Sequence, residues 1–298
     1  MTQYIGRFAP SPSGPLHFGS LVTALGSYLQ AKKQNGRWLL RIEDIDPPRE
    51  IKGATEDILR CLEAHQLFWD GEVTYQSHRS ELYEEKIRWL KEQGFSYHCQ
   101  CTRSQFSSLS AGCLCPCHDK LLPNHNNAIR FKHLSPILEF KDNLLGLQTF
   151  AQGSLRAHFA IKRKDGLYAY QLAVVVDDIQ QGITEVARGA DLLDATVFQL
   201  ALFNALRQPP PAFLHFPLVV TQPGKKLSKQ NHATAIDPRF ANVNLCHALA
   251  FFGLSVPVVN QSDTPENLLD WALEHWDINN VPAKTECIDN RIGEQESI

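Results

Sequence analysis

Two short segments far apart in the chain carry residues suited to phosphate chemistry. The first, residues 4–20, passes through a turn rich in Pro and Gly and contains Gly14, His17 and Gly19. The second, residues 226–230 with the sequence KLSKQ, is a short cationic loop. A helix that begins after a strand offers unpaired N–H groups to an anion, and lysines offset charge that develops on phosphates. Together the two segments predict a site that binds ATP and stabilises attack at its α-phosphate.

Each segment also has an ordinary interpretation, as a turn with a solvated histidine or as a surface cluster of lysines. The pairing of the two segments favours the chemical interpretation. Glycines let a phosphate or adenine approach the backbone closely, and an imidazole can donate to a phosphate oxygen. The candidate ATP-binding residues are Gly14, His17, Gly19, Lys226, Ser228 and Lys229.

The elements that must position these residues form an α/β pattern. Residues 4–9 are a short apolar run stopped by proline, which predicts a buried strand. An amphipathic helix is expected from Gly19 to about Lys33, followed by a second strand over residues 38–43. A strand, a crossover helix and a second strand make the βαβ unit of a parallel sheet.

Further along the chain, the apolar run Ala173–Val176 ends in Asp177-Asp178 and predicts a fully buried parallel strand. Residues 128–165 are expected to form irregular β structure. Other helices are expected at Thr55–Ala64, Ser80–Gln93, Leu192–Leu206, Asn244–Phe252 and Glu266–Trp276, and a strand at His215–Val220. We therefore expect a discontinuous catalytic domain over residues 1–80 and 165–240, an insertion over 81–164 and a short helical region over 241–298.

Five of the eight cysteines lie within residues 99–117. In a reducing compartment such a cluster indicates a metal site. Cys99, Cys101, Cys113 and Cys117 could close a tetrahedral structural Zn²⁺ site, with Cys115 as a fifth thiol and His118 as another ligand, and spacing does not choose among them. The alternative is that these cysteines are buried without a metal.

Overall composition narrows the class of protein. No apolar run approaches the roughly 18 residues of a membrane span, and the N-terminus lacks a secretory pattern, so a cytoplasmic protein is expected. The formal net charge of −3 argues against a protein that coats nucleic acid through bulk charge. An RNA substrate bound at a local basic patch is still compatible with it.

The two segments resemble the HIGH motif and the KMSKS loop of class I aminoacyl-tRNA synthetases. The stretches Arg7–Gly14 and Leu40–Asp44 are similar to the glutamyl branch, and the resemblance covers about residues 4–240. It implies a Rossmann-like class I catalytic core that forms an aminoacyl-adenylate from Mg-ATP, with His17 and Lys229 stabilising the α-phosphate. The chain departs from the motifs at Ser20, Leu227 and Gln230.

A glutamate substrate has two carboxylates and one ammonium group, so its site needs guanidinium groups and an anion. Arg7, Arg188 and Glu43 supply these groups. By resemblance to the glutamyl branch, the residues that contact the amino acid are Arg7, Phe8, Ala9, Pro10, Ser11, Glu43, Tyr170 and Arg188. Taken singly, each is as compatible with an ordinary salt bridge or a structural tyrosine.

The cysteine stretch also resembles that of a truncated paralogue of the glutamyl enzymes. This resemblance implies Cys99, Cys101, Cys113 and Cys117 as zinc ligands, with Cys115 spare. Only 58 residues follow Phe240, so an anticodon-reading region of the usual size is not expected. In that paralogue, glutamate is activated without tRNA and then transferred to the queuosine base at the wobble position of tRNA(Asp).

The expected partners are therefore ATP, L-glutamate and tRNA(Asp) carrying queuosine, with no membrane and a monomeric protein. Three alternatives stay open. The protein could be a minimal enzyme that charges a tRNA 3′ end, a catalytically silent paralogue that binds glutamate or RNA, or an adenylyltransferase acting on a small molecule.

Overall fold

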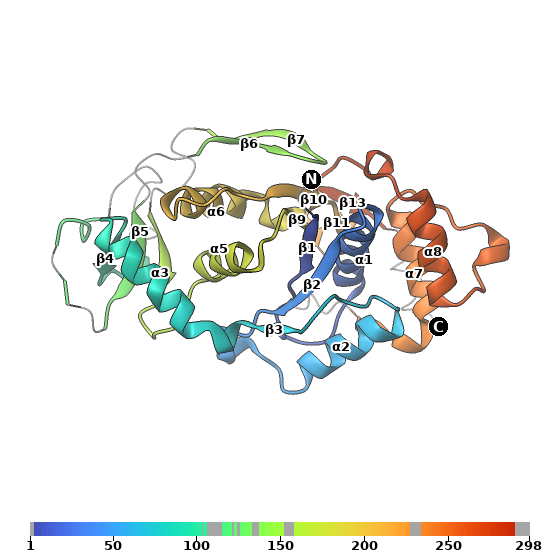
Figure 1. The fold of residues 1–298 in the computed structure, drawn as a ribbon, viewed down its shortest axis with the longest axis horizontal. Coiled ribbons are helices and arrows are strands. Elements are labelled where there is room, and N and C mark those ends of the chain that lie inside the picture. The colour runs from blue at the N-terminus through green and yellow to red at the C-terminus, as the bar shows by residue number, and fades with distance from the viewer. Residues whose placement is uncertain are drawn as a thin grey trace.

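The computed structural model describes residues 3–102, 104–105, 115–120, 122–123, 126–132, 137–151, 158–226 and 234–289. Helices lie on both faces of a central set of parallel strands, as Figure 1 shows. The small sheet that contains β4 (Ser96–Cys99) and β5 (Ala128–Lys132) lies at one end of the molecule. Two helices, α7 (Ala241–Phe251) and α8 (Pro265–His275), lie at the other end.

The first βαβ unit is confirmed. Strand β1 (Ile5–Phe8) leads through helix α1 (Phe18–Lys33) to strand β2 (Arg37–Ile42), which pairs with β1 in parallel. The apolar side of α1 is fully buried, because Leu21, Leu25 and Leu29 pack in the main core. A short strand, β3 (Thr74–Tyr75), extends this sheet beside β2.

A second parallel pair continues the sheet. Strand β9 (Glu185–Gly189) leads through α6 (Leu193–Ala205) to β10 (Ala212–Phe216). Strands β1 and β9 lie side by side, because the Thr184 N–H donates to the Ile5 carbonyl at 2.9 Å. The strand order β3-β2-β1-β9-β10 therefore reverses direction between β1 and β9. Helix α1 lies on one side of the strands and α6 on the other (Figure 1), so this point is the topological switch where doubly wound folds bind ligands.

The edge of the sheet carries two more strands. Strand β6 (Glu139–Asp142) pairs with β10 in parallel, and β7 (Gly146–Thr149) pairs with β6 in antiparallel orientation. The small end sheet has the order β4-β5-β8, where β8 is His158–Lys162. The expectation of β structure between residues 128 and 165 is confirmed for the described part of that range.

The predicted strand at Ala173–Val176 is wrong. These residues belong to helix α5 (Tyr170–Gln181), which ends at Gly182 in the left-handed conformation. Every residue from Leu172 to Asp178 is buried, because α5 packs between α3 (Ser80–Glu92) and α6. A helix that is buried all round has the same continuous apolar run as a buried strand, so the two cannot be separated by pattern.

The strand expected at His215–Val220 is divided into two. Strand β10 ends at Phe216, and β11 (Leu218–Gln222) begins after Pro217, which has no N–H for a ladder. Strand β11 pairs with β12 (Lys225–Lys226) and with the late strand β13 (Glu286–Ile288). The described residues after 240, which end at 289, thus contain the expected helices and also a strand that pairs with β11.

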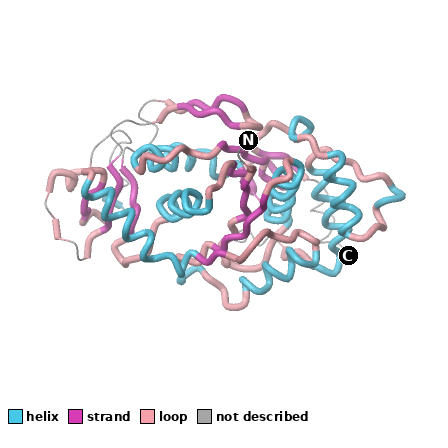
Figure 2. Tube along the Cα trace, viewed as in Figure 1, coloured by secondary structure: helices cyan, strands magenta, loops and turns pink. Residues whose placement is uncertain are grey.

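The expected helices at the remaining positions are present, as the tube in Figure 2 shows. Helix α2 is Ala54–Ala64, and α7 and α8 pack against α1. Gly26 permits this close packing, since a Cβ there would lie 2.7 Å from Phe252 and 2.8 Å from Phe216. Among the described residues, no helix is both long and apolar enough to cross a membrane.

Candidate active site

A cavity of about 630 Å³ opens at the carboxyl ends of β1, β2 and β9. It is lined by all eight residues expected to contact the amino acid, and by His17 and Gly19 from the predicted ATP-binding set. The switch point between β1 and β9 explains this convergence, because strand ends and helix N-termini meet there. The structure thus brings most of the candidate residues to one place.

Arg7 on β1 is held by a buried carboxylate. Its Nε and Nη2 atoms donate to Asp178 of α5 at 3.1 and 3.3 Å. Arg41 of β2 donates to the same carboxylate at 2.8 Å. Burial alone would raise the pKa of Asp178, but the two guanidinium groups hold it below its ordinary value. Arg41 and Asp178 are not among the predicted site residues, although the paired acids that follow the apolar run are a signal.

Glu43 follows β2 and is the anion expected to bind an ammonium group. Burial raises the pKa of Glu43 to about 7, although Arg41 and Arg7 draw it down. Its Oε1 atom is buried and makes no hydrogen bond in the described structure, and the nearest cation, the Nη2 of Arg41, is 3.8 Å away. A buried carboxylate in this state gains most from a cationic ligand.

Arg188 on β9 is held by neutral groups. Its Nε donates to His215 at 3.0 Å, and its Nη2 donates to the Thr196 hydroxyl at 2.8 Å and to the Leu192 carbonyl at 3.2 Å. Its Nη1 lies 3.5 Å from the hydroxyl of Tyr170, which also lines the cavity. Burial lowers the pKa of Arg188, since no described carboxylate is bonded to it. A carboxylate ligand would offset this cost.

His17 is the N-cap of α1, next to the cavity. Its Nδ1 accepts from the Ser20 backbone N–H at 3.2 Å, so the ring hydrogen belongs on Nε2, which lies 3.1 Å from the Ser20 hydroxyl. His17 therefore presents an N–H donor at a helix N-terminus, which suits a phosphate oxygen. Gly14 has a φ of 135°, a backbone conformation that favours glycine, and it does not line the cavity.

The lysine loop is described only at its two ends. The predicted residues Ser228, Lys229 and Gln230 lie outside the described residues, and only the backbone of Lys226 is described, in β12. The chain is described again from residue 234, where Ala235 forms a β-bridge with His17. The segment that follows the loop is therefore attached to the turn that carries the histidine.

A second cavity of about 310 Å³ adjoins the first and shares Ser11, Glu43 and Tyr170 with it. It extends past Gln76, which is fully buried and donates to Asp177 at 2.7 Å. Polar space therefore lies beside the cavity that the predicted amino-acid-binding residues line.

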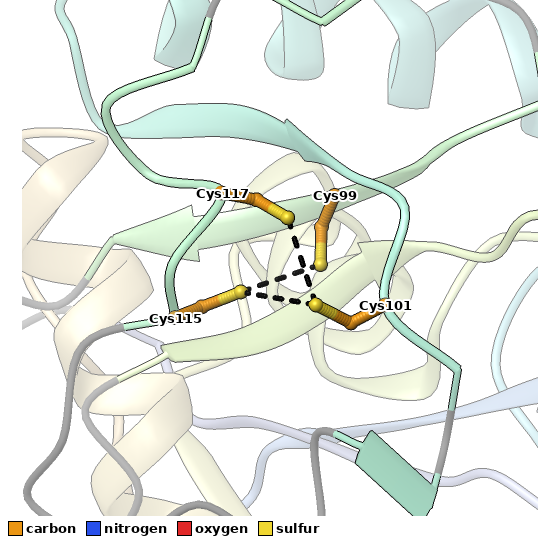
Figure 3. Close-up of side chains that lie close together, drawn as sticks. All are labelled: Cys99, Cys101, Cys115 and Cys117. Carbon is orange, nitrogen blue, oxygen red and sulfur yellow. Dashed lines mark hydrogen bonds between the residues drawn. The ribbon is translucent and has the colours of Figure 1, made fainter.

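Four cysteines come together on the small end sheet, as Figure 3 shows. The Sγ of Cys115 lies 3.5 Å from that of Cys99 and 3.7 Å from that of Cys101, and Cys101 lies 3.6 Å from Cys117. A tetrahedral zinc with Zn–S bonds of about 2.3 Å requires S···S distances of about 3.8 Å. None of the four is in a disulfide, so the thiols fit a structural zinc ion.

Three of the predicted ligands, Cys99, Cys101 and Cys117, are in the described cluster. Cys115, which was expected to be spare, is one of the four, and Cys113 lies outside the described residues. Two Cys-x-Cys steps, 99–101 and 115–117, therefore face each other across the cluster. The predicted alternative ligand His118 is turned elsewhere, since its ring bonds the Cys115 carbonyl and Asp119.

The fold and the cavity define the catalytic domain of a class I tRNA synthetase. The family described as tRNA synthetases class I (E and Q), catalytic domain, matches residues 4–111 and 117–252. A glutamyl-Q tRNA(Asp) synthetase of Vibrio parahaemolyticus is 49% identical over 96% of this chain and 97% of that protein. One of Photobacterium profundum is 50% identical over 96% of this chain and 93% of that protein. The chain therefore belongs to the glutamyl-Q tRNA(Asp) synthetase family, within the class I synthetases for E and Q.

Solved structures agree on the fold. A glutamate tRNA ligase from Elizabethkingia meningosepticum, in complex with its amino acid, superimposes with a TM-score of 0.80 at 22% identity, covering 99% of this chain and 68% of that one. A glutamate-tRNA synthetase from Elizabethkingia anophelis gives a TM-score of 0.79 at 22% identity, covering 99% of this chain and 70% of that one.

Proposed function

We propose that this protein activates L-glutamate with ATP, without tRNA, and transfers it to the queuosine base at the wobble position of tRNA(Asp). The observation that carries the proposal is the cavity at the switch point. It places two buried guanidinium groups and one buried carboxylate beside the N-terminus of α1. The names of the relatives that match nearly the whole chain support the same activity.

In the first step, an oxygen of the substrate α-carboxylate attacks the α-phosphorus of Mg-ATP. A P–O bond to that carboxylate forms, the bond to pyrophosphate breaks, and glutamyl-adenylate remains. Arg7 and Arg188 bind carboxylates, and Glu43 binds the ammonium group, which together fix the attacking oxygen. His17 and Lys229 donate to phosphate oxygens as negative charge develops there.

In the second step, a ring hydroxyl of queuosine attacks the acyl carbon of the adenylate. An ester C–O bond forms, the C–O bond to the phosphate breaks, and AMP leaves, while the hydroxyl proton is released. Tyr170 and Glu43 face both cavities, so they hold the amino acid on the side from which an acceptor approaches. The charge on the bound ammonium also polarises the acyl group toward attack.

The zinc ion belongs to this proposal as a structural component. Cys99, Cys101, Cys115 and Cys117 would hold it, and four thiolates leave no open position for catalysis. The proposal also keeps residues 1–80 and 165–240 as the catalytic domain and residues 81–164 as an insertion. The proposal also includes a cytoplasmic location and a monomeric state. Light scattering of the purified protein would test the monomeric state.

The acceptor is tested with radiolabelled glutamate and three RNAs. We expect label on tRNA(Asp) that contains queuosine and none on queuosine-free tRNA(Asp) or on tRNA(Glu). Equal labelling of both forms of tRNA(Asp) would contradict base modification. Labelling of tRNA(Glu) alone would favour the alternative in which the protein charges a tRNA 3′ end. The solved structures of similar fold are glutamate tRNA ligases.

The activation step is tested by exchange of pyrophosphate into ATP, with glutamate and no tRNA. We expect Lys229→Ala to lower this exchange by about a hundredfold, the effect of losing one group that stabilises transition-state charge. Lys225→Ala is the matched control in the same segment and should leave the exchange unchanged. Absence of glutamate-dependent exchange in the unmodified protein would favour the silent-paralogue alternative.

A further inference from the structure

The guanidinium of Arg188 is oriented by a buried chain of hydrogen bonds behind the cavity. Its Nε and Nη2 atoms form one edge of the group, and this edge is bonded to His215 and Thr196. The Nη1 atom is left on the side of Tyr170 and the cavity. One edge is thus used by the protein, and the other end is presented to a ligand.

His215 accepts from Arg188 only in one tautomer. Its Nδ1 lies 2.6 Å from Oδ2 of Asp142, and its Nε2 lies 3.0 Å from the Nε of Arg188. An N–H on Nδ1 donates to the carboxylate and leaves a lone pair on Nε2 for the arginine. With the hydrogen on Nε2 instead, two donors would face each other at 3.0 Å.

Asp142 is itself fixed in orientation. Its Oδ1 accepts from the backbone N–H groups of Leu144 and Leu145 at 3.0 and 2.8 Å, and that of His215 lies 3.4 Å away. Burial alone would raise the pKa of Asp142, but the bonds from His215, Leu145 and Leu144 lower it. The second oxygen, Oδ2, is therefore held as an acceptor toward His215.

All the side chains in this series of hydrogen bonds are buried. Asp142 and His215 are 1% and 0% exposed, and Arg188 is 4% exposed. Burial lowers the pKa of His215, which keeps the ring neutral and able to accept. In such surroundings, each partner is strongly directional because water cannot substitute for it.

We propose that Asp142 and His215 are positioning residues: Asp142 sets the tautomer of His215, and His215 turns Arg188 so that its Nη1 end receives a substrate carboxylate. The inference rests on the proposed function for the identity of that substrate, glutamate. Neither residue touches the ligand, since neither lines the cavity.

The decisive variant is Asp142→Asn. The three backbone N–H groups require the amide oxygen on their side, so the amide NH₂ faces Nδ1 of His215. The ring must then accept at Nδ1 and carry its hydrogen on Nε2, against Arg188. We expect the KM for glutamate in pyrophosphate exchange to rise about ten- to hundredfold, as for other partners that orient a ligand-binding group. The KM for ATP should stay unchanged.

His215→Phe removes the acceptor while keeping a ring of similar shape, and it should raise the KM for glutamate in the same range. Asn143→Ala is the matched control, because Asn143 neighbours Asp142 in the same turn but bonds Glu185 at 2.6 Å. Thermal melting is measured for all three variants. An unchanged KM for glutamate in folded Asp142→Asn and His215→Phe would overturn the proposal, as would an equal rise in Asn143→Ala.

The tautomer is tested without any substrate by ¹⁵N NMR of the histidine side chains. We expect Nδ1 of His215 to be protonated in the unmodified protein and Nε2 to be protonated in Asp142→Asn. An Nε2-protonated ring in the unmodified protein would overturn the proposal. Failure of glutamate activation alone would instead contradict the proposed function, so the two failures are distinguishable.

Discussion

Two arginines from neighbouring strands line one cavity, and the protein holds them in different ways. Arg7 donates directly to the buried carboxylate of Asp178. Arg188 is bonded only to neutral groups in the described structure. The carboxylate of Asp142 belongs to the same series of hydrogen bonds but contacts His215 and not Arg188. The charge of Arg7 is thus balanced within the fold. Arg188 has no bonded carboxylate in the described structure, so its charge is available to a ligand, whereas Arg7 lines the same cavity while it is already paired within the fold.

The strongest test of this comparison is Arg188→Lys. A lysine keeps the charge but cannot make the same set of directed hydrogen bonds. We expect kcat/KM for glutamate to fall about 10²–10³-fold, since a charged hydrogen-bonded contact is worth about 2–5 kcal/mol. Thermal stability should change little. Pyrophosphate exchange and thermal melting measure the two effects, and a lower melting temperature with an unchanged KM would break the comparison.

Asp178→Asn tests the other arginine. It leaves Arg7 and Arg41 buried without their shared carboxylate, so we expect the free energy of unfolding to fall by about 3–5 kcal/mol. Urea unfolding measures the loss. Asp142→Asn is the counterpart on the side of Arg188 and should cost only about 1–3 kcal/mol, because no ion pair with an arginine is broken. Equal losses for the two variants would remove the distinction.

Glu43 lines the same cavity as the two arginines, and it is the group proposed to bind the ammonium group of the substrate. Because its pKa is raised to about 7, ammonium binding should lower that pKa and release a proton at pH values between the lowered pKa and about 7. Glutamate affinity should then rise by at most about tenfold per pH unit up to pH 7 and level off above it. Calorimetry in two buffers of different ionisation enthalpy measures the proton release. Glu43→Gln should abolish it, and persistence in that variant would assign the proton to another group.

The raised pKa of Glu43 also makes the free energy of unfolding depend on pH. Between the ordinary pKa of a glutamate and about 7, the folded protein holds a proton that the unfolded chain has lost. The contribution of Glu43 to the free energy of unfolding therefore falls as the pH rises through this window.

The smallest effect on the cavity is expected from zinc removal. The cysteine cluster lies on the small sheet at the far end of the molecule from α7 and α8 (Figure 1). Chelation should lower the melting temperature while the KM for glutamate changes by less than about twofold, as is usual for distant sites. Metal analysis should find one zinc per chain before chelation. A large change in KM would show that the end sheet also shapes the site.

Much of the catalytic fold could be predicted because its patterns are local. The apolar run before Pro10, the spacing in α1 and the strand after Gly36 each specify one element, and together they predict the βαβ unit. The residues that line the cavity were recognised through motifs, whose meaning comes from a family and not from periodicity. Their convergence on one cavity is a property of the switch point, which a linear pattern does not reveal.

The wrong strand, the missed residues and the open choice among the cysteines have physical causes. Leu172–Asp178 is buried on every side, so it lacks the polar face that would distinguish helix α5 from a strand. Asp142 and His215 lie 73 positions apart and meet only because β6 pairs with β10, and nothing in either local sequence points to the other. Cys115 and Cys113 differ by two positions within a stretch that has no periodicity, so spacing alone could not choose between them.

The segment between α3 and α5 leaves and rejoins the rest of the protein at one place, where side chains from its two ends are bonded to each other. We call this place the base of the segment. Tyr83 and Arg79 both donate to Asp177, and Glu84 bonds Lys162 and Tyr168 on the returning strand and its loop. The cost of closing a loop grows only slowly with its length once its ends are fixed. The part of this segment that forms the small end sheet can therefore change in length without moving Tyr170, whereas β6 must stay, because it pairs with β10 and brings Asp142 to His215. The contacts at this base thus fix the position of Tyr170 independently of the length of the chain that extends to the end sheet.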